Sequence, residues 1–330
     1  MSDGKPVVLT SDTPAAEDRL GTSREHRDIS REQIEELDAA GYSGSHDLHL
    51  VYFPWRDTTV TMVGPRAHRW LLSSRNRNKI TDTEQRRLGR ATIAIAGLSV
   101  GSQVALTLAM EGVGGQLRLA DPDTLAVSNL NRLSGSLLDV ARNKATLTAR
   151  RIWEINPYQD IRLFPGGVTP GNRNEFLQGS DLLVEETDDL VTKITLRQAA
   201  KQRRIPVVMD TNDRGMLDIE RFDSDPAYPI LHGLVPGVEG RDFDAEPPST
   251  SERQEMLYGL AEFSKLSPRM QESFPLIGRE LASWPQLAED VMIGAGITTA
   301  AVRAIILGEP APSGRWRFDV NTRIASGGME

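Results

Sequence analysis

Short apolar segments alternate with longer amphipathic segments along the middle of the chain. The apolar segments, which predict buried strands, are 91–97, 116–121, 160–164, 181–186 and 205–210. The segments between them, which have the apolar spacing of helices, are 99–113, 139–156, 171–178 and 190–203. Alternating strands and helices build parallel strands joined by crossover helices. We therefore predict an α/β fold, with a Rossmann-like, doubly wound, mostly parallel sheet covered by helices on both faces.

The residues before this region, 1–70, form an N-terminal extension in the prediction. Residues 1–30 are rich in Ser, Asp, Glu and Arg, which is typical of a loosely packed tail. A short helix is expected at 32–37. Residues 49–63 have the β-rich composition of a strand or hairpin that Pro54 interrupts. Short β elements beside the main fold are the expected outcome.

The central domain is expected to span residues 71–225, and an irregular segment follows it. Residues 226–287 are rich in Pro, Gly and acids, which predicts a lid or insertion with short helices. Residues 288–307 predict an apolar helix, and 316–320 a closing strand. Region 226–330 is thus expected to be a lid followed by a helix and a strand that complete the central domain.

Composition narrows the class of partner. The chain has 46 acidic and 38 basic side chains, a net charge of −8, which argues against nucleic acid or an anionic membrane as the main partner. Its lack of cysteine excludes disulfides, Cys-ligated zinc and an enzyme thioester. The N-terminal residues do not resemble a signal peptide, and the apolar run Met292–Leu307 contains Arg303 and is shorter than a membrane span. We expect a soluble, cytoplasmic protein.

A glycine turn, GLSVGS (97–102), follows the first predicted strand. Such a turn lets backbone N–H groups approach a phosphate at a helix N-terminus, although a plain tight turn has the same appearance. Asp121 follows the second predicted strand, where a carboxylate can accept hydrogen bonds from a ribose hydroxyl. Together these features indicate a nucleotide site, and they leave open whether it takes a nicotinamide cofactor or ATP.

A longer pattern distinguishes between these nucleotides. The stretch ADPDTLAVSNLNRL (120–133) is followed by Lys144 and, after a further strand, by ETDD (186–189). This combination resembles the ThiF/MoeB/HesA family, which includes the ubiquitin-activating enzymes, over about residues 70–225. The family pattern is a glycine turn, an acid after the second strand, S-N-L-x-R, a downstream Lys and an acidic turn. The resemblance implies an adenylyltransferase that uses ATP and Mg²⁺.

The resemblance also assigns roles around the nucleotide. Gly97 and Gly101 would shape the loop around it, and Asp121 would hold the ribose with Asp123 nearby. The residues that would contact the phosphates are Asn129, Arg132 and Lys144. Arginine acts there as a fork and lysine as a point charge. A hydride carrier has no leaving pyrophosphate to neutralise, so this set favours ATP over NAD.

Catalysis in the family further depends on a metal ion and on an arginine from a second subunit. Asp188 would bind Mg²⁺ through oxygen. Arg77, with Arg75 as second choice, stands where the family has an arginine that reaches into the partner's ATP site. This implies a homodimer; the alternative is that these residues and Lys79 form a solvated basic patch. The expected catalytic residues are Arg77, Arg132, Lys144 and Asp188.

Several positions depart from the family pattern. Ser99 stands where glycine is common, Asp189 where Asn is usual, and Lys193 where many members have Arg. Glu185 and Glu186 either make the magnesium end of the site more acidic or are exposed strand-end residues. Each phosphate-neutralising residue is retained, so the departures concern the orientation of the substrate.

The implied reaction is the activation of a carboxylate. The carboxylate attacks the α-phosphorus of ATP, pyrophosphate leaves, and an acyl-AMP forms without a thioester on the enzyme. A peptide, a carrier-protein C-terminus or a small acid fits this chemistry, and the acidic net charge argues against tRNA. The alternatives are an NAD- or FAD-dependent oxidoreductase and a non-catalytic partner subunit. The joint presence of Arg132, Lys144 and Asp188 argues against the second alternative.

Three further polar residues follow the last predicted strand of the central region. Asp210, Asn212 and Arg214 lie at the carboxyl edge of the sheet, where ligands of open α/β folds bind. They either line the pocket for the acyl substrate or are ordinary turn residues.

Overall fold

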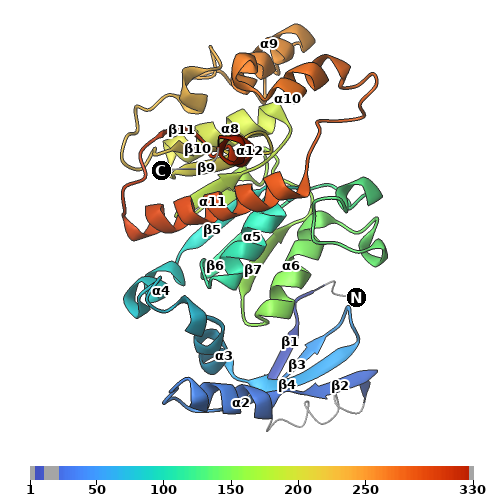
Figure 1. Cartoon of the computed structure of the whole chain (residues 1–330), viewed down its shortest axis with the longest axis vertical. Helices are drawn as coiled ribbons and strands as arrows, with labels where there is room; N and C mark the ends of the chain where they lie inside the picture. Colours follow the sequence, from blue (N-terminus) through green and yellow to red (C-terminus); the bar gives the residue numbers. More distant parts are fainter. Residues whose placement is uncertain (1–3, 11–21, 327–330) are drawn as a thin grey trace.

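The computed structural model describes residues 4–10 and 22–326 of the chain. Its centre is a seven-stranded sheet with the order β11-β10-β9-β8-β5-β6-β7 (Figure 1). The strands are β5 (Thr92–Ala96), β6 (Gln116–Ala120), β7 (Asp160–Phe164), β8 (Leu182–Glu185), β9 (Val207–Thr211), β10 (Met216–Glu220) and β11 (Gly314–Arg317).

Strands β5 to β9 are parallel, and the order reverses between β5 and β8. One half of the sheet runs from β5 to β7, and the other from β8 to β9. In such a doubly wound sheet, ligands bind at the carboxyl ends of the strands beside the reversal. The predicted fold class is confirmed. The antiparallel strand β10, which lies between β9 and β11, was not predicted.

Helices cover both faces of this sheet because successive strand residues point to opposite sides. Ile93 and Ile95 of β5 belong to the hydrophobic core on one face, and Ala94 and Ala96 to the core on the other. The first core includes helices α4 (Asp82–Leu88), α5 (Gly101–Met110), α6 (Lys144–Ile155) and α11 (Ala288–Leu307). The second includes α7 (Arg173–Leu177) and α8 (Leu190–Gln202).

Local capping explains where two of these helices begin. Helix α4 starts after Thr81, whose side chain and that of Glu84 form the reciprocal hydrogen bonds of a capping box. Helix α6 starts at Lys144 and not at residue 139, because Asn143 caps it by accepting the Thr146 N–H. The expected helix start at 139 is therefore wrong: residues 137–139 form a separate 3₁₀ turn, and Ala141 has a left-handed backbone.

The N-terminal region folds into a second, four-stranded sheet with the order β1-β3-β4-β2. Its elements are β1 (Val7–Thr10), β2 (Glu25–Asp28), α2 (Ser30–Ala39), β3 (Leu48–Phe53), β4 (Thr58–Val63) and α3 (Pro65–Leu72). The predicted hairpin is confirmed, and Pro54 lies in its turn without interrupting a strand. The expectation of a loose tail is wrong for 7–10 and 25–28, which pair with β3 and β4. Residues 1–3 and 11–21 of that tail lie outside the described residues.

Side-chain hydrogen bonds join this small sheet to helix α6 of the central sheet. The Trp55 indole N–H and the Arg56 guanidinium both donate to Glu154, at 2.6 and 2.8 Å. The Tyr158 hydroxyl donates to the Val63 carbonyl at 2.8 Å. Figure 1 shows the small sheet beside the end of the central sheet that is remote from α9 and α10.

Helix α11 (Ala288–Leu307) is longer than the apolar run identified in the sequence. Its length and composition alone are compatible with a membrane span, so the expectation that it is too short was wrong. The helix packs against α5 and β9 in the central fold, where Val291, Ala295 and Val302 are buried. This packing accounts for its apolar composition.

Residues 226–287 form irregular structure at one end of the molecule, beyond β9 and β10 (Figure 1). Their helices are η4 (Ile230–Gly233), α9 (Thr250–Ala261), η5 (Phe263–Lys265), α10 (Pro268–Ser273) and η6 (Phe274–Leu276). Arg315 of β11 anchors this segment, because it donates to Asp218 at 2.6 Å and to Glu262 at 3.0 Å. After β11, helix α12 (Val320–Ala325) ends the described chain.

Candidate active site

The glycine turn lies at the carboxyl end of β5, directly at the reversal of strand order. Gly97 has a φ of +85°, and a Cβ there would lie 2.4 Å from the carbonyl oxygen of Glu186. Glycine is thus required by both the backbone conformation and the close approach of the end of β8. Gly101 is the first residue of α5, where a Cβ would lie 3.2 Å from Ile95. The turn brings the N-terminus of α5 to the sheet edge.

Asp121 holds this turn in place. One carboxylate oxygen accepts the Leu98 N–H at 2.6 Å, and the other accepts the Asp123 N–H at 2.8 Å. Burial raises the pKa of Asp121, and the Leu98 N–H and the Lys144 ammonium oppose that change. The carboxylate therefore stabilises the loop, and the ribose contact that the family resemblance assigns to it stays a prediction.

Lys144 lies beside the same acids. Its side chain is almost fully buried, and its ammonium donates to the exposed Asp123 carboxylate at 3.0 Å. Because Lys144 is the first residue of α6, the Asn143 cap fixes where its side chain leaves the helix. Asp121, Asp123 and Lys144 therefore form one charged group at the ends of β5 and β6.

Arg132 and Asp188 form a second charged group. Partial burial lowers the pKa of Arg132, and the nearby Asp188 carboxylate opposes that change. The Nη1 atom of Arg132 donates to the Ser128 carbonyl at 3.1 Å and to Asn131 Oδ1 at 2.7 Å. Its Nε is buried and has no hydrogen-bond partner within residues 4–10 and 22–326. A buried guanidinium N–H without a partner is what an anion site would present.

The remaining phosphate candidate, Asn129, shapes the loop that carries Arg132. Its side-chain oxygen accepts the Ala126 N–H at 3.0 Å, which closes the 3₁₀ turn Val127–Asn129. The two charged groups flank the glycine turn, since Asp121 follows β6 and Asp188 follows β8 on either side of β5. That all of these residues bind one nucleotide stays a prediction.

The acidic turn after β8 is built on a buried ion network. Glu185 is fully buried and pairs with Lys193 at 2.9 Å and with Arg197. Burial would raise the pKa of Glu185, but Lys193 and Arg197 outweigh it and lower the pKa to about 2. The Glu185 carboxylate also accepts the Thr187 N–H at 2.9 Å and so fixes the turn that carries Asp188.

The interpretation of Glu185 and Glu186 as exposed strand-end residues is wrong, because both side chains are buried. That they make the magnesium end of the site more acidic stays a prediction. Across the described ranges, no three His, Cys, Asp or Glu side chains gather as a metal site of protein ligands alone. Magnesium commonly takes phosphate oxygens and several waters, so a site with Asp188 as its single carboxylate is compatible with the residues present.

Glu186 forms a buried acid pair with Asp210. Its carboxylate accepts the Asp210 N–H at 2.9 Å, and Thr298 of α11 donates to Asp210 at 3.2 Å. Burial raises the pKa of Asp210 to about 7 and the pKa of Glu186 well above its ordinary value. The other charges near Glu186 are Lys193, which lowers its pKa, and Glu185, which raises it. The raised pKa values favour one proton shared by the two carboxylates near neutral pH. Asp210 itself is buried, and a role for it in the pocket of the acyl substrate stays a prediction.

The pair predicts a specific pH dependence of stability. The pKa of Asp210 in the folded protein lies above the value near 4 of an unfolded Asp, so the folded protein holds a proton that the unfolded chain releases. Stability is therefore lost as the pH rises from about 4 to about 7. The D210N variant should be more stable than the wild type at pH 8, by about 2 kcal/mol. Urea unfolding of D210N and of wild type at pH 5 and pH 8 measures the difference in stability between the two proteins. A stability advantage of D210N over wild type that is smaller at pH 8 than at pH 5 would contradict the shared proton.

The other two candidates after β9 differ in their surroundings. Asn212 is buried, and its Oδ1 has no hydrogen-bond partner within the described ranges. Arg214 is half-buried and donates to Asp319 at 2.7 Å and to the Lys265 carbonyl at 3.2 Å. Arg214 thus fastens the lid segment and the last helix to the end of β9.

Arg77 lies away from both charged groups of the same chain. Its guanidinium is 4.2 Å from the Trp70 ring centroid and 3.9 Å from Asp82, and its side chain is exposed, as is that of Arg75. The neighbouring Asn76 donates to the carbonyl of Glu111, just beyond the C-terminus of α5. Since α5 starts at the carboxyl edge of the sheet, Arg77 lies toward the amino edge and does not reach Arg132 within one chain.

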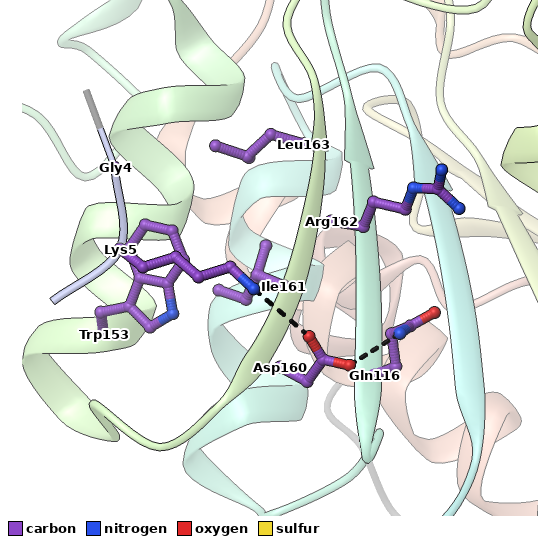
Figure 2. Close-up of a pocket in the computed structure, with 8 residues that line it drawn as sticks. All are labelled: Gly4, Lys5, Gln116, Trp153, Asp160, Ile161, Arg162 and Leu163. Carbon is purple, nitrogen blue, oxygen red and sulfur yellow. Dashed lines mark hydrogen bonds and ion pairs between the residues drawn. The ribbon is translucent and has the colours of Figure 1, made fainter. Parts of the chain in front are cut away.

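A surface hollow lies away from this site. It has a volume of roughly 440 Å³ and lies at the amino ends of β6 and β7 (Figure 2). Figure 2 shows Asp160 in it, paired with Lys5 at 3.7 Å and with Gln116 at 2.7 Å. None of the residues that line this hollow is a predicted site residue.

The fold and the residues at its strand reversal define a Rossmann-like protein of the doubly wound class. Residues 73–224 match the ThiF family. This region of the chain is therefore similar to the ThiF family, and relatives that match it include adenylyltransferases of the ThiF/MoeB type.

Three relatives show how far the sequence similarity extends. MT1398 of Mycobacterium tuberculosis is 42% identical over 276 residues, covering 83% of this chain and 38% of that protein. A sulfur carrier protein adenylyltransferase of Thermus thermophilus is 30% identical over 154 residues, covering 45% of this chain and 54% of the relative. A tRNA threonylcarbamoyladenosine dehydratase of Haemophilus influenzae is 30% identical over 138 residues, covering 40% of this chain and 51% of the relative. The chain thus spans between 38% and 54% of the length of these relatives.

The same fold occurs among solved structures. The E. coli tRNA N6-threonylcarbamoyladenosine dehydratase aligns with a TM-score of 0.51 and 16% identity, covering 72% of this chain and 95% of that chain. This likeness concerns the fold.

Proposed function

We propose that the protein is an ATP-dependent adenylyltransferase that activates a carboxylate as an acyl-AMP and releases pyrophosphate. The observations that carry the proposal are the close packing of Gly97 against Glu186, two residues before Asp188, and the electrostatic effect of Asp188 on Arg132. The ThiF-family match over residues 73–224 supports the same conclusion. A relative named as an adenylyltransferase supports the reaction class.

The residues present would perform three tasks in this reaction. The N-terminus of α5 and the Nε of Arg132, which has no partner among the described residues, would bind phosphate oxygens. Lys144 would add positive charge. Pre-placed positive charge stabilises the negative charge that grows as the carboxylate attacks the α-phosphorus and pyrophosphate leaves. Magnesium bound at Asp188 would neutralise the triphosphate.

The chain cannot form a thioester of its own, because it has no cysteine. The acyl-AMP would therefore pass to a nucleophile from the substrate itself or from another protein. A peptide, a carrier-protein C-terminus and a small acid are the proposed carboxylates. The carrier-protein class is favoured by the relative from Thermus thermophilus, whose name states that it adenylates a sulfur carrier protein.

We further propose a homodimer in which Arg77 completes the site of the partner subunit. The supporting observation is its exposure near the amino edge of its own sheet, away from Arg132 and Asp188. An exposed guanidinium stacked on Trp70 is available to a second subunit. A charge supplied in trans is a known way to stabilise a transferring phosphoryl group.

The test of the proposed function is ATP–pyrophosphate exchange with a panel of carboxylates, together with mass spectrometry of the acyl-AMP. Exchange is expected with one carboxylate class and not without a carboxylate. Mg·ATP should also raise the melting temperature, whereas NAD should leave it unchanged. Stabilisation by NAD and not by Mg·ATP would instead support the oxidoreductase alternative.

A further inference from the structure

Asn131 makes hydrogen bonds to two segments that are far apart in the sequence. Its Oδ1 accepts from the Nη1 of Arg132 at 2.7 Å. Its Nδ2 donates to the carbonyl oxygen of Gln286 at 3.0 Å. One exposed amide side chain therefore joins the arginine loop to the end of the lid segment, immediately before α11.

We propose that Asn131 is a positioning residue, which orients the Arg132 guanidinium for phosphate and ties residues 278–287 to the nucleotide edge of the sheet. The proposal rests on the adenylyltransferase function proposed above. It concerns the variable position of S-N-L-x-R, to which the family pattern gave no role.

The geometry at Arg132 supports the orienting role. The carbonyl of Ser128 and the amide of Asn131 both hold the same nitrogen, Nη1, which leaves the opposite part of the guanidinium unheld. The Nε on that part is buried and has no hydrogen-bond partner among the described residues. A guanidinium fixed at Nη1 with a buried, unbonded Nε is already oriented when an anion arrives, so little side-chain entropy is lost on binding.

The geometry at Gln286 supports the proposed link between Asn131 and residues 278–287. The segment 278–287 contains Arg279, which is exposed, and Leu287, which precedes α11 without a side-chain cap. The bond from Asn131 uses the backbone carbonyl of Gln286, whereas the side-chain Oε1 of that residue has no hydrogen-bond partner within the described ranges. The Gln286 side chain can therefore be removed without losing the bond.

Three variants separate these roles. N131A loses both bonds. N131D keeps an acceptor for Arg132 but has no N–H to donate to Gln286. Q286A keeps the backbone carbonyl and serves as the matched control. The measurements are the KM and kcat for ATP in pyrophosphate exchange, and the rate of trypsin cleavage after Arg279 in the ATP-free protein, followed by mass spectrometry.

N131A should raise the KM for ATP about fivefold, the value of one hydrogen bond, with kcat within about twofold of wild type. In N131A the charge of Arg132 is still present and bound ATP can reorient it, so the loss of pre-orientation appears in the KM, whereas removal of the charge in R132A affects kcat. Cleavage after Arg279 should become about fivefold faster in N131A and in N131D, and stay at the wild-type rate in Q286A. A merely structural role would lower stability without this division between KM and kcat.

Two results would overturn the inference while the proposed function stands: a KM for N131A equal to that of wild type, or a cleavage rate for N131D equal to that of wild type. Faster cleavage in Q286A would also contradict it, because the backbone bond would then not be the tie. If the wild-type protein catalyses no exchange with any carboxylate, the proposed function fails and the role toward Arg132 fails with it. Trypsin cleavage still decides the tie to 278–287 in that case.

Discussion

Replacing Arg132 with alanine is expected to lower ATP–pyrophosphate exchange by about a thousandfold, the effect of removing one charge-stabilising donor from a reacting centre. The Nε of this side chain has no hydrogen-bond partner in the part of the chain that the structure describes. The side chain as a whole is half-buried, so its loss should leave the core unchanged. The same loss is expected for D188A, because the magnesium ligand would be removed. Initial exchange rates at saturating ATP measure both effects, and circular dichroism confirms the fold.

R162A is the matched control for R132A. Arg162 is also a partly exposed arginine, but it lies on β7 and pairs with Glu175, away from the strand reversal. Its exchange rate should equal that of wild type. Retention of more than about a tenth of the wild-type rate in both R132A and D188A would refute the assigned roles.

The same assay tests the proposed dimer by complementation. R77A and R132A should each be inactive alone, since each removes one half of every composite site. In a mixed dimer, one of the two sites has Arg132 from one chain and Arg77 from the other and is therefore intact. After random exchange of subunits about half of the dimers are mixed, so about a quarter of all sites become active. Absence of recovery, with subunit exchange verified by native mass spectrometry, would show that Arg77 does not act in trans.

R197A is expected to destabilise the protein by about 3–5 kcal/mol, the usual effect of removing one partner from a buried ion pair. Arg197 is fully buried between Glu185 and Glu220, to which its Nε donates at 2.6 Å. Without the guanidinium, the buried Glu220 loses its ion-pair partner and the buried Glu185 keeps only Lys193. Urea unfolding at pH 7 measures the loss.

Two variants of the same helix define the control for this prediction. Q202A removes an exposed side chain of α8 and should change stability by less than about 0.5 kcal/mol. R197K keeps the charge but lacks the planar fork, so its stability should lie between those of wild type and R197A. An R197A variant as stable as Q202A would contradict the importance of the network.

The sequence predicted the parallel part of the sheet because its strands are continuous apolar runs. Strand β7 was predicted with the bounds that the structure has, and β9 was displaced by about two residues. Strand β10 was missed because Asp218 and Glu220 make it look polar, although both side chains are buried. Strand β2 was missed for the opposite reason: each of its residues is exposed, so no apolar periodicity marks it.

The candidate site was predictable to the extent that motif residues follow strand ends. Arg132 and Asp188 lie near each other because their loops flank the strand reversal, as a doubly wound fold requires. The burial of Glu185 and Glu186 was not predictable from their own neighbours in the sequence, since Arg197 and Asp210 come from other elements. The spacing of Lys193 and Arg197, one helical turn apart, is a signal that could have indicated a paired charge network.

The late position of β11 and α11 in the chain has a consequence for how the protein reaches its native state. During synthesis, β9 and β10 emerge from the ribosome roughly 90 residues before β11, which pairs with β10. Until α11 and β11 arrive, β10 presents an unpaired edge and the sheet lacks part of its covering layer. A nascent or truncated chain that stops near residue 225 would therefore expose an unpaired strand edge and apolar surface that promote aggregation. Its solubility would then depend on chaperones.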